Sequence, residues 1–287
     1  MTTYDNTTCW QYNIRVANLE EDLKLANLTK EQAENLTCQD FTFCEVTSKE
    51  EKKNLVEFIK RHEWLGTISQ YPTHYFACYY KDILAGVLMF NVPNAFTKML
   101  GEDTDKLERL ISRGSCISWS PKNLASKFIM WAINYMVQNT RYRLFTAYSD
   151  VEAGELGTIY QACGFYCLGK GSGTTRRYIN PYTGKVVSDR FFRHKTAYKK
   201  FAQELNIPWQ KDWNHSTGMS WNNIPDNIEK QLRDFSKQKQ ASSTLIEKPS
   251  KYKYAYVLGR DRRETRALRK QFLSLNKIYD YPKERGK

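Results

Sequence analysis

The sequence lacks the features that mark a membrane, secreted or zinc-binding protein. No stretch of its 287 residues approaches the roughly 20 consecutive apolar residues of a membrane-spanning helix. Residues 1–6 hold no basic patch followed by an apolar run, so we expect no secretory signal. The seven cysteines form no CxxC pair, which speaks against a structural zinc site and favours reduced thiols. These absences predict a cytoplasmic protein with no membrane partner.

The sequence does have a marked excess of positive charge. Its 44 Lys and Arg residues against 31 Asp and Glu residues give a net charge of +13. Residues 251–287 alone hold 12 basic and 4 acidic side chains, which is more than half of the excess. A field of this sign attracts polyanions, and nucleic acid is the commonest such partner. A basic tail that serves only solubility is the alternative interpretation.

Hydrophobic patterning predicts alternating strands and helices. Residues 41–46, 73–80 and 84–90 read as strands, followed by a central strand over 107–118 and another over 143–148. Ser120-Pro121 predicts a helix start, with serine as N-cap and proline in the first turn. The order predicts a mixed α/β fold with a central, mostly antiparallel, splayed sheet flanked by helices and one right-handed crossover.

Composition predicts three parts of the chain. Residues 1–40 form a polar N-terminal arm, residues 41–205 the α/β catalytic domain, and residues 206–287 a C-terminal extension. The extension begins Trp-rich, turns polar over 236–251 in the manner of a linker, and ends in a basic helix over 260–272. Residues 252–258 are able to add one more strand.

Two segments carry a resemblance to known enzymes. Thr146-Ala-Tyr-Ser-Asp150 ends a strand, and Gly157–Phe165 is a short helix that contains a tyrosine and ends in Gly-Phe. Together they resemble the last conserved segment of GNAT-type acyltransferases, in which a strand splays open. With Leu107–Leu110, Pro121–Asn123 and the Tyr281-Pro-Lys end, the chain is similar to the Mom DNA-modification proteins of Mu-like phages. The resemblance covers roughly residues 41–200 and, faintly, the tail.

One departure from the acetyl-CoA-dependent pattern concerns the donor. Those enzymes carry a Gly-rich loop whose amides hold a pyrophosphate, whereas Arg113–Asn123 here has no Gly-x-Gly. The following helix start is still able to hold an anion through its amides, so Ser120, Lys122 and Asn123 are the candidate cofactor-binding residues. The donor is therefore left open, with an acyl-CoA-type molecule or a divalent iron ion as the cofactors to test.

The resemblance implies roles for several residues. Tyr160 matches the tyrosine that protonates the leaving group, and Asp150 at a strand end is placed to orient or deprotonate an amine. Ser149, Ser126, His62 and Glu63 are weaker candidates for the same chemistry. His62 and Asp150 form a candidate iron site if they converge, because imidazole and carboxylate are suitable ligands. Each residue also has a plain structural interpretation, such as a packed tyrosine, a loop-capping aspartate or a solvated histidine.

An enzyme that modifies a base in duplex DNA must flip that base into a pocket. Trp64, Trp119 and Tyr148 are candidates to stack on it, with core packing as the alternative. Two basic clusters are candidates to contact phosphates. They comprise Arg176, Arg177, Arg190, Arg193 and Lys195 in a hairpin region, and Arg262, Arg263, Arg266 and Arg269 in the basic helix.

The resemblance thus implies a phage DNA base-modification enzyme. It would transfer an acyl-like or carbamoylmethyl-like group to the N6 amine of adenine, protecting the DNA from host restriction, in the host cytoplasm. Two alternatives stay open: a GNAT N-acetyltransferase acting on a small amine or a protein, and a non-catalytic nucleic-acid-binding protein. The sequence also leaves open whether the chain forms a homodimer.

Overall fold

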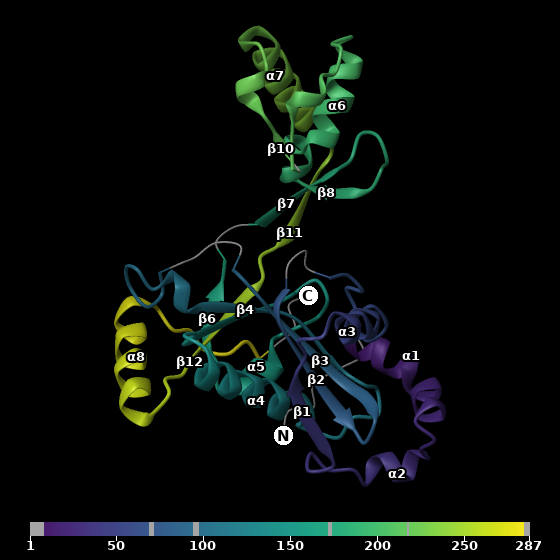
Figure 1. Ribbon diagram of the computed structural model, residues 1–287, viewed down its shortest axis with the longest axis vertical. Coiled ribbons are helices and arrows are strands. Elements are labelled where there is room, and N and C mark those ends of the chain that lie inside the picture. Colours follow the sequence, from purple (N-terminus) through teal and green to yellow (C-terminus); the bar gives the residue numbers. More distant parts are fainter. Residues whose placement is uncertain (1–8, 69–71, 94–97, 172–173, 217, 284–287) are drawn as a thin grey trace. The chain divides into compact units, whose positions relative to one another are not determined.

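The computed structural model describes residues 9–68, 72–93, 98–171, 174–216 and 218–283 (Figure 1). The chain forms two compact units. The first holds residues 1–171 and 251–287, and the second holds residues 172–250. The predicted boundaries at 40, 205 and 206 do not coincide with these units. The reason is that the N-terminal helix and the C-terminal segment both pack into the first unit.

A seven-stranded sheet forms the centre of the first unit. Only β4 and β5 pair in parallel, and every other neighbouring pair is antiparallel. The predicted fold class, a mixed α/β fold with a mostly antiparallel sheet flanked by helices, is confirmed. The strands, in spatial order, are β1 (Phe41–Glu45), β2 (Pro72–Tyr80), β3 (Ile83–Asn91), β4 (Glu108–Cys116), β5 (Leu144–Ser149), β12 (Tyr252–Val257) and β6 (Tyr166–Lys170).

The sheet splays open between β4 and β5. These strands have nine and six residues, yet they pair only over Glu108–Leu110 and Leu144–Thr146. Beyond these three pairs β4 stays with β3 and β5 stays with β12. The second halves of the two strands therefore frame an opening, as the resemblance implied.

Helices flank this sheet (Figure 1). Apolar residues at 3–4 spacing make α4 pack on the sheet, with Phe128 stacked on Phe43 at 5.2 Å and Trp131 edge-on to Phe76 at 6.0 Å. A short 3-10 turn, η1 (Asp105–Leu107), precedes β4. The helices of this unit are α1 (Trp10–Leu25), α2 (Lys30–Glu34), α3 (Lys49–His62), α4 (Leu124–Asn139), α5 (Thr158–Ala162) and α8 (Arg262–Leu275).

The start of α4 differs from the prediction. The helix begins at Leu124, and its N-cap is Asn123 in the left-handed conformation, with φ of 67°, rather than Ser120. Ser120 instead belongs to a buried turn, in which its amide donates to the Ile117 carbonyl at 3.1 Å. Asparagine tolerates a positive φ better than most residues, so the chain turns into the helix there.

The C-terminal segment completes the sheet. The predicted strand at 252–258 is present as β12, inserted between β5 and β6, although about 80 residues separate it from β6 along the chain. Phe272 of α8 stacks on Tyr166 at 5.3 Å, and Arg143 forms a 2.6 Å ion pair with Glu264. Beyond α8, the Tyr281 hydroxyl donates to the Phe165 carbonyl at 2.6 Å. The basic segment is thus part of the first unit, not a separate extension.

The second unit has its own core, centred on Phe192, Phe201, Trp213 and Leu232. The expected linker over 236–251 is the end of α7 followed by β11, because β11 pairs with β7. Its strands are β7 (Thr174–Ile179), β8 (Val186–Ser188), β9 (Asn214–His215), β10 (Gly218–Met219) and β11 (Leu245–Pro249). Its helices are η2 (Asp189–Arg193), α6 (Lys195–Glu204), η3 (Lys211–Trp213), η4 (Trp221–Asn223) and α7 (Asp226–Ser242).

Within the residues that the structure describes, no helix has both the length and the apolar character needed to cross a membrane.

Candidate functional site

The opening between β4 and β5 gathers acidic and aromatic side chains from four segments. Glu63 follows α3, Arg113 lies on β4, Glu155 lies in the loop after β5, and Tyr160 lies on α5. The two glutamates and the tyrosine are close enough for the charge of each glutamate to raise the pKa of the tyrosine. These residues form what we call the carboxylate site: Glu63, Glu155 and Tyr160.

Glu63 is the most perturbed acid of this site. Its side chain is 12% exposed, and its Oε2 lies 3.3 Å from Nε of Arg113. Burial raises its pKa from the ordinary 4.5 to about 7; Arg113 opposes this shift and the neighbouring Glu155 adds to it. A carboxyl group that titrates near neutral pH is suited to accept a proton in catalysis.

The carboxylate of Glu155 is held in place by two hydrogen bonds. The indole Nε1 of Trp64 donates to its Oε1 at 2.9 Å, and the backbone amide of Asp150 donates to its Oε2 at 3.1 Å. Burial raises the pKa of Glu155, these two hydrogen bonds lower it, and the charge of Asp150 raises it. Two carboxyl groups with raised pKa values in one site form an arrangement typical of functional sites.

Tyr160 presents a phenol to the same site. Its ring packs against Phe165 and Tyr254, with centroids 5.4 and 5.5 Å away. Burial and the two nearby carboxylates raise its pKa well above the ordinary value of 10. Its hydroxyl forms no hydrogen bond with any of the described residues. The phenol therefore stays protonated at neutral pH and is able to donate a proton or a hydrogen bond.

The carboxylate of Asp150 already has partners, one in its own loop and one at Lys251. Its Oδ2 forms a 2.7 Å ion pair with Lys251, and its Oδ1 accepts from the Glu152 amide at 3.1 Å. Its carbonyl accepts from the amides of Ala153 and Glu155. Ser149 is only 1% exposed. Asp150 thus stabilises the loop that carries Glu155. This is the loop-capping role that the sequence analysis gave as its structural alternative.

The structure does not bring His62 and Asp150 together as a metal site. His62 is buried, its Nε2 lies 3.1 Å from Asp22 Oδ2, and its Nδ1 lies 3.1 Å from the Phe58 carbonyl oxygen. Both ring nitrogens are therefore occupied by internal acceptors. Across the described ranges, no three His, Cys, Asp or Glu side chains lie together as a metal site would require. The proposed iron site at His62 and Asp150 is not supported.

The residues predicted to hold a cofactor surround the start of α4. The Ser120 carbonyl accepts from Arg15 at 2.6 Å, and the Ser126 hydroxyl donates to the Asn123 carbonyl at 3.0 Å. Lys122 is exposed. Asn123 makes no side-chain cap, and the Leu124 amide donates to the Pro121 carbonyl at 3.3 Å; the amides of Ala125 and Ser126 have no acceptor among the described residues and are available to an anion.

The candidate stacking residues differ in their surroundings. Trp119 is 4% exposed and packs on Phe41 and Tyr80, so it belongs to the core. Trp64 is half-buried and edge-on to Trp10, with ring centroids 5.1 Å apart. Tyr148 is 44% exposed on β5. Of these three residues, Trp64 contacts the carboxylate site, through its hydrogen bond to Glu155.

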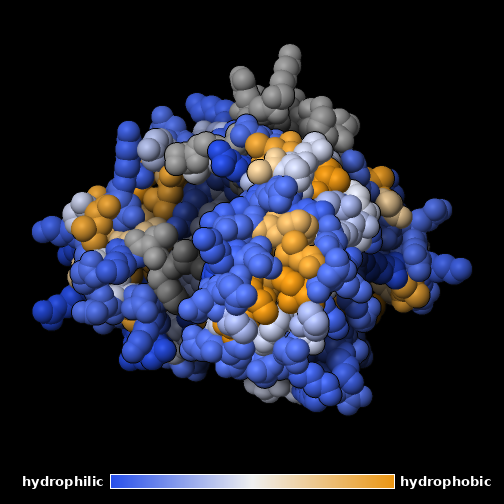
Figure 2. All heavy atoms as spheres, turned by 90° about the horizontal axis from the view of Figure 1, so that it is seen from above, coloured by the Kyte–Doolittle hydropathy of each residue, from blue (hydrophilic) through white to orange (hydrophobic). Residues whose placement is uncertain are grey.

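The predicted phosphate contacts fall on two surfaces, one in each unit. On α8, Arg262, Arg263 and Arg266 are exposed and form no ion pair within the described residues, whereas Arg269 Nε donates to the Val257 carbonyl at 3.2 Å. Of the second unit's cluster, Arg176 and Arg190 are exposed, Arg177 and Lys195 are half-buried, and Arg193 pairs with Asp189. Figure 2 shows one face of the molecule as mostly hydrophilic, with limited hydrophobic patches.

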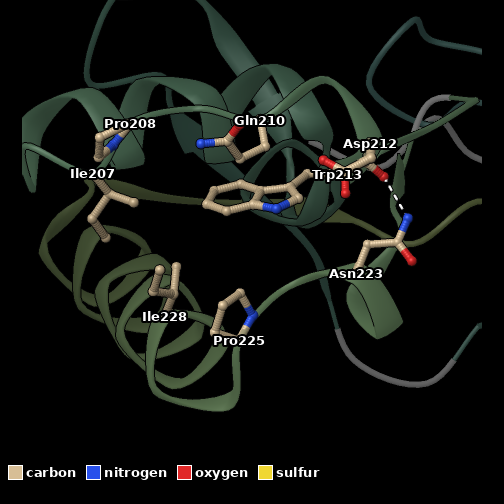
Figure 3. Close-up of a pocket in the computed structure, with 8 residues that line it drawn as sticks. All are labelled: Ile207, Pro208, Gln210, Asp212, Trp213, Asn223, Pro225 and Ile228. Atoms are coloured by element: carbon tan, nitrogen blue, oxygen red, sulfur yellow. Dashed lines mark hydrogen bonds between the residues drawn. The ribbon is translucent and has the colours of Figure 1, made fainter.

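The second unit holds a separate hollow of about 440 Å³. Figure 3 shows the Trp213 indole between Ile207 and Pro208 on one side and Pro225 and Ile228 on the other. The Asn223 amide donates to the Asp212 carbonyl at 2.8 Å at its edge. This lining is mainly apolar, and we assign no chemistry to it.

Sequence reasoning missed Glu155 and Arg113. The signal for Glu155 was its place in a loop with three acids, Asp150, Glu152 and Glu155, directly after a strand. Arg113 was noted only for the loop that it begins. Its role depends on where α3 ends relative to β4, and no local pattern shows this.

Comparisons with known proteins were made on the whole chain. The model of the Mom protein family matches residues 40–283. No curated protein matches the sequence. Solved structures with some similarity include a GNAT family acetyltransferase from Elizabethkingia anophelis with acetyl-CoA bound, at 14% identity and a TM-score of 0.36, covering 76% of this chain and 99% of that one. Arabidopsis thaliana NAA60 in complex with acetyl-CoA is 10% identical with a TM-score of 0.36, covering 76% and 100%. A Bacillus subtilis acetyltransferase in complex with CoA is 10% identical with a TM-score of 0.35, covering 76% and 97%.

Proposed function

The chain belongs to the Mom protein family, and from this premise we propose that it is a transferase that modifies the N6 amine of adenine in DNA. The group transferred is acyl-like or carbamoylmethyl-like, and the modification would protect phage DNA from host restriction. The observation that carries the proposal is the carboxylate site, in which Glu63 has a pKa of about 7 beside a protonated tyrosine.

The chemistry needs a base and an acid at one place. In the acyl form of the reaction, the N6 nitrogen attacks the donor's carbonyl carbon, and the bond from that carbon to the leaving group breaks. Glu63 takes the proton that N6 loses, because its carboxylate is half-formed near pH 7. Tyr160 gives a proton to the leaving group. Glu155, held by Trp64, sits beside both groups and keeps the pKa of each raised.

Asp150 takes a supporting part in this proposal. Its carboxylate already pairs with Lys251 and accepts from the Glu152 amide, so both of its oxygens have internal partners. Its backbone amide holds Glu155. We therefore assign the base to Glu63 and treat Asp150 as a positioning residue.

An acyl-CoA-type donor fits the start of α4. Such a donor carries phosphates, and the uncapped first turn of α4, with Lys122 beside it, supplies amides and a positive charge. Ser120 does not take part, because it is buried and its carbonyl is occupied by Arg15. Bound there, the donor would supply the activated acyl group.

The proposed DNA contact rests on exposed arginines. Arg262, Arg263 and Arg266 project from one exposed stretch of α8 without an ion pair among the described residues. A guanidinium group that is not already paired loses no internal partner when it binds a phosphate. Arg176 and Arg190 offer the same chemistry in the second unit.

Nucleoside mass spectrometry tests the function. The protein is expressed with a plasmid, the plasmid DNA is digested to nucleosides, and a heavier deoxyadenosine is sought. The proposal expects one new deoxyadenosine adduct, whose mass identifies the group. Unmodified DNA from cells that hold the folded, soluble protein would contradict it. Acetylation of a small amine in that case would favour the acetyltransferase alternative, and DNA binding without any adduct would favour the non-catalytic one.

A further inference from the structure

The N-terminal helix α1 lies against the carboxylate site, although it is outside the residues that match the family model. That match begins at residue 40, whereas α1 spans Trp10–Leu25 and runs beside α3 (Figure 1). Half of the residues of α1 are polar or charged, and specific hydrogen bonds add to the packing of Leu19 and Leu23 against the core in fixing its place.

Gln11 forms hydrogen bonds on both sides of Glu63 in the chain. Its Nε2 donates to the His62 carbonyl at 2.6 Å, and its Oε1 accepts from the Trp64 amide at 3.1 Å. The same Nε2 lies 3.3 Å from the Ser115 hydroxyl of β4, which itself donates to the His62 carbonyl at 2.7 Å. One side-chain amide thus fixes the backbone that carries Glu63 to the strand beside the splay.

Trp10 connects the helix to the opposite wall of the site. Its backbone amide donates to the Ala153 carbonyl at 3.0 Å, in the loop that carries Glu155. Its ring packs edge-on against Trp64, whose indole donates to Glu155. Residues 10 and 11 therefore contact both of the segments that bring the two glutamates together.

The rest of α1 is anchored by hydrogen bonds of charged side chains, of which Asp22 is buried. Asp22 is 2% exposed; it accepts from Arg61 at 2.6 Å and lies 3.1 Å from His62 Nε2. Arg15 donates to the carbonyls of Ser118 and Ser120, each at 2.6 Å. Such charge-assisted bonds hold a helix in one register. The helix α1 is thus held in the first unit.

We propose that α1 is a component of the carboxylate site and that Gln11 is the positioning residue that holds Glu63 opposite Glu155. The inference rests on the proposed function for its effect on catalysis, and on geometry alone for its effect on Glu63. Family members that lack such a helix would need another group in this place.

The physical consequence follows from burial. Without Gln11, the carbonyl of His62 keeps only the Ser115 donor and the amide of Trp64 loses its acceptor, so the segment 62–64 moves toward solvent more readily. Better hydration of Glu63 lowers its pKa toward the ordinary value. A glutamate in place of Gln11 also loses the donor to the His62 carbonyl, but it keeps an acceptor for the Trp64 amide and adds a negative charge that raises the pKa of Glu63 instead.

The test compares Gln11→Ala and Gln11→Glu with the control Asn13→Ala. Asn13 is an exposed amide on the same helix, and its side chain has no partner among the described residues. The titration of the Glu63 carboxyl is followed by NMR, and exchange of the Trp64 amide by hydrogen–deuterium exchange. We expect the Glu63 midpoint to fall by about one pH unit in Gln11→Ala and to rise in Gln11→Glu. Trp64 amide exchange should be about tenfold faster in Gln11→Ala than in Asn13→Ala.

These readouts separate the inference from the proposed function. The Glu63 titration and the Trp64 exchange do not need activity, so they decide the inference even if wild-type protein leaves DNA unmodified. Where DNA modification is measured, its pH dependence should move in opposite directions in the two Gln11 variants, which general destabilisation would not produce. A Glu63 midpoint and a Trp64 exchange rate that are equal in all variants and wild type would overturn the inference.

Discussion

The indole nitrogen of Trp64 donates a 2.9 Å hydrogen bond to Oε1 of Glu155, and this bond ties the end of α3 to the loop after β5. Trp64 directly follows Glu63 in the chain, so the bond also fixes the two glutamates relative to each other. Because both carboxyl groups are buried near one another, ionising either one is costly, and both pKa values are raised. The predictions below depend on this arrangement.

The rate of DNA modification should rise with pH through about 7. Glu63 accepts a proton only as a carboxylate, and its pKa is about 7, so the active fraction falls about tenfold per pH unit well below that value. Tyr160 keeps its proton across this range, because its pKa is raised from 10. Initial rates of adduct formation between pH 5.5 and 9 check this. A flat profile down to pH 5.5 would mean that an ordinary carboxylate, or none, is the base.

Glu63→Gln should make the protein more stable at pH 8 and leave its stability unchanged near pH 4. The pKa of Glu63 is higher in the folded protein than the ordinary 4.5, so the free energy of unfolding falls as pH rises from about 4.5 to 7. This loss is on the order of 3 kcal/mol, and a neutral glutamine avoids it. Urea unfolding at both pH values measures it, with Glu152→Gln as an exposed acid from the same region for control. Equal destabilisation at both pH values would contradict the raised pKa.

Tyr160→Phe should remove activity without removing stability. The hydroxyl makes no hydrogen bond with the described residues, and the ring contacts with Phe165 and Tyr254 are kept by phenylalanine. We expect a rate loss of roughly 100-fold, typical of a missing general acid. The free energy of unfolding should change by less than about 0.5 kcal/mol. Thermal unfolding and adduct formation measure the two effects, and unchanged activity would rule out Tyr160 as the proton donor.

Neutralising the α8 arginines should weaken DNA binding and its salt dependence together. The substitutions to test are Arg262→Gln, Arg263→Gln and Arg266→Gln. Each one that removes a phosphate contact should make the slope of log K against log salt concentration less steep by about 0.9. Lys30→Gln is the matched control, because Lys30 already pairs with Glu34 on an exposed helix. Binding to duplex DNA at several salt concentrations measures the slopes. If all three arginine variants keep the wild-type slope, α8 does not contact the phosphates.

The sequence predicted the main strands, including the one at 252–258, but not where that last strand lies in the sheet. The strands at 41–46, 73–80 and 84–90 and the central strand alternate or are strongly apolar, and such local patterns survive in the fold. The place of β12 between β5 and β6 depends on pairing across about 80 residues, which no local pattern encodes. For the same reason the C-terminal segment was separated from the domain to which it belongs.

The candidate site was predicted in part for similar reasons. Tyr160 and Glu63 were found because they lie in recognisable segments, at the short helix α5 and the end of α3. The partners that set their chemistry come from distant parts of the chain: Glu155 from a loop, Arg113 from β4 and Gln11 from α1. Asp150 and His62 had suitable residue types, yet their internal partners Lys251 and Asp22 occupy them. Those partners are visible only in the folded chain.

The most direct test of this account compares Glu63→Gln with Asp150→Asn in the amount of modified deoxyadenosine formed. Both variants replace one carboxylate by an amide, and both residues lie beside Glu155. The account predicts that Glu63→Gln loses the adduct by roughly 100-fold or more, because it removes the base, whereas Asp150→Asn keeps most of it. Full activity in Glu63→Gln together with loss in Asp150→Asn would contradict the account and return the role of base to Asp150.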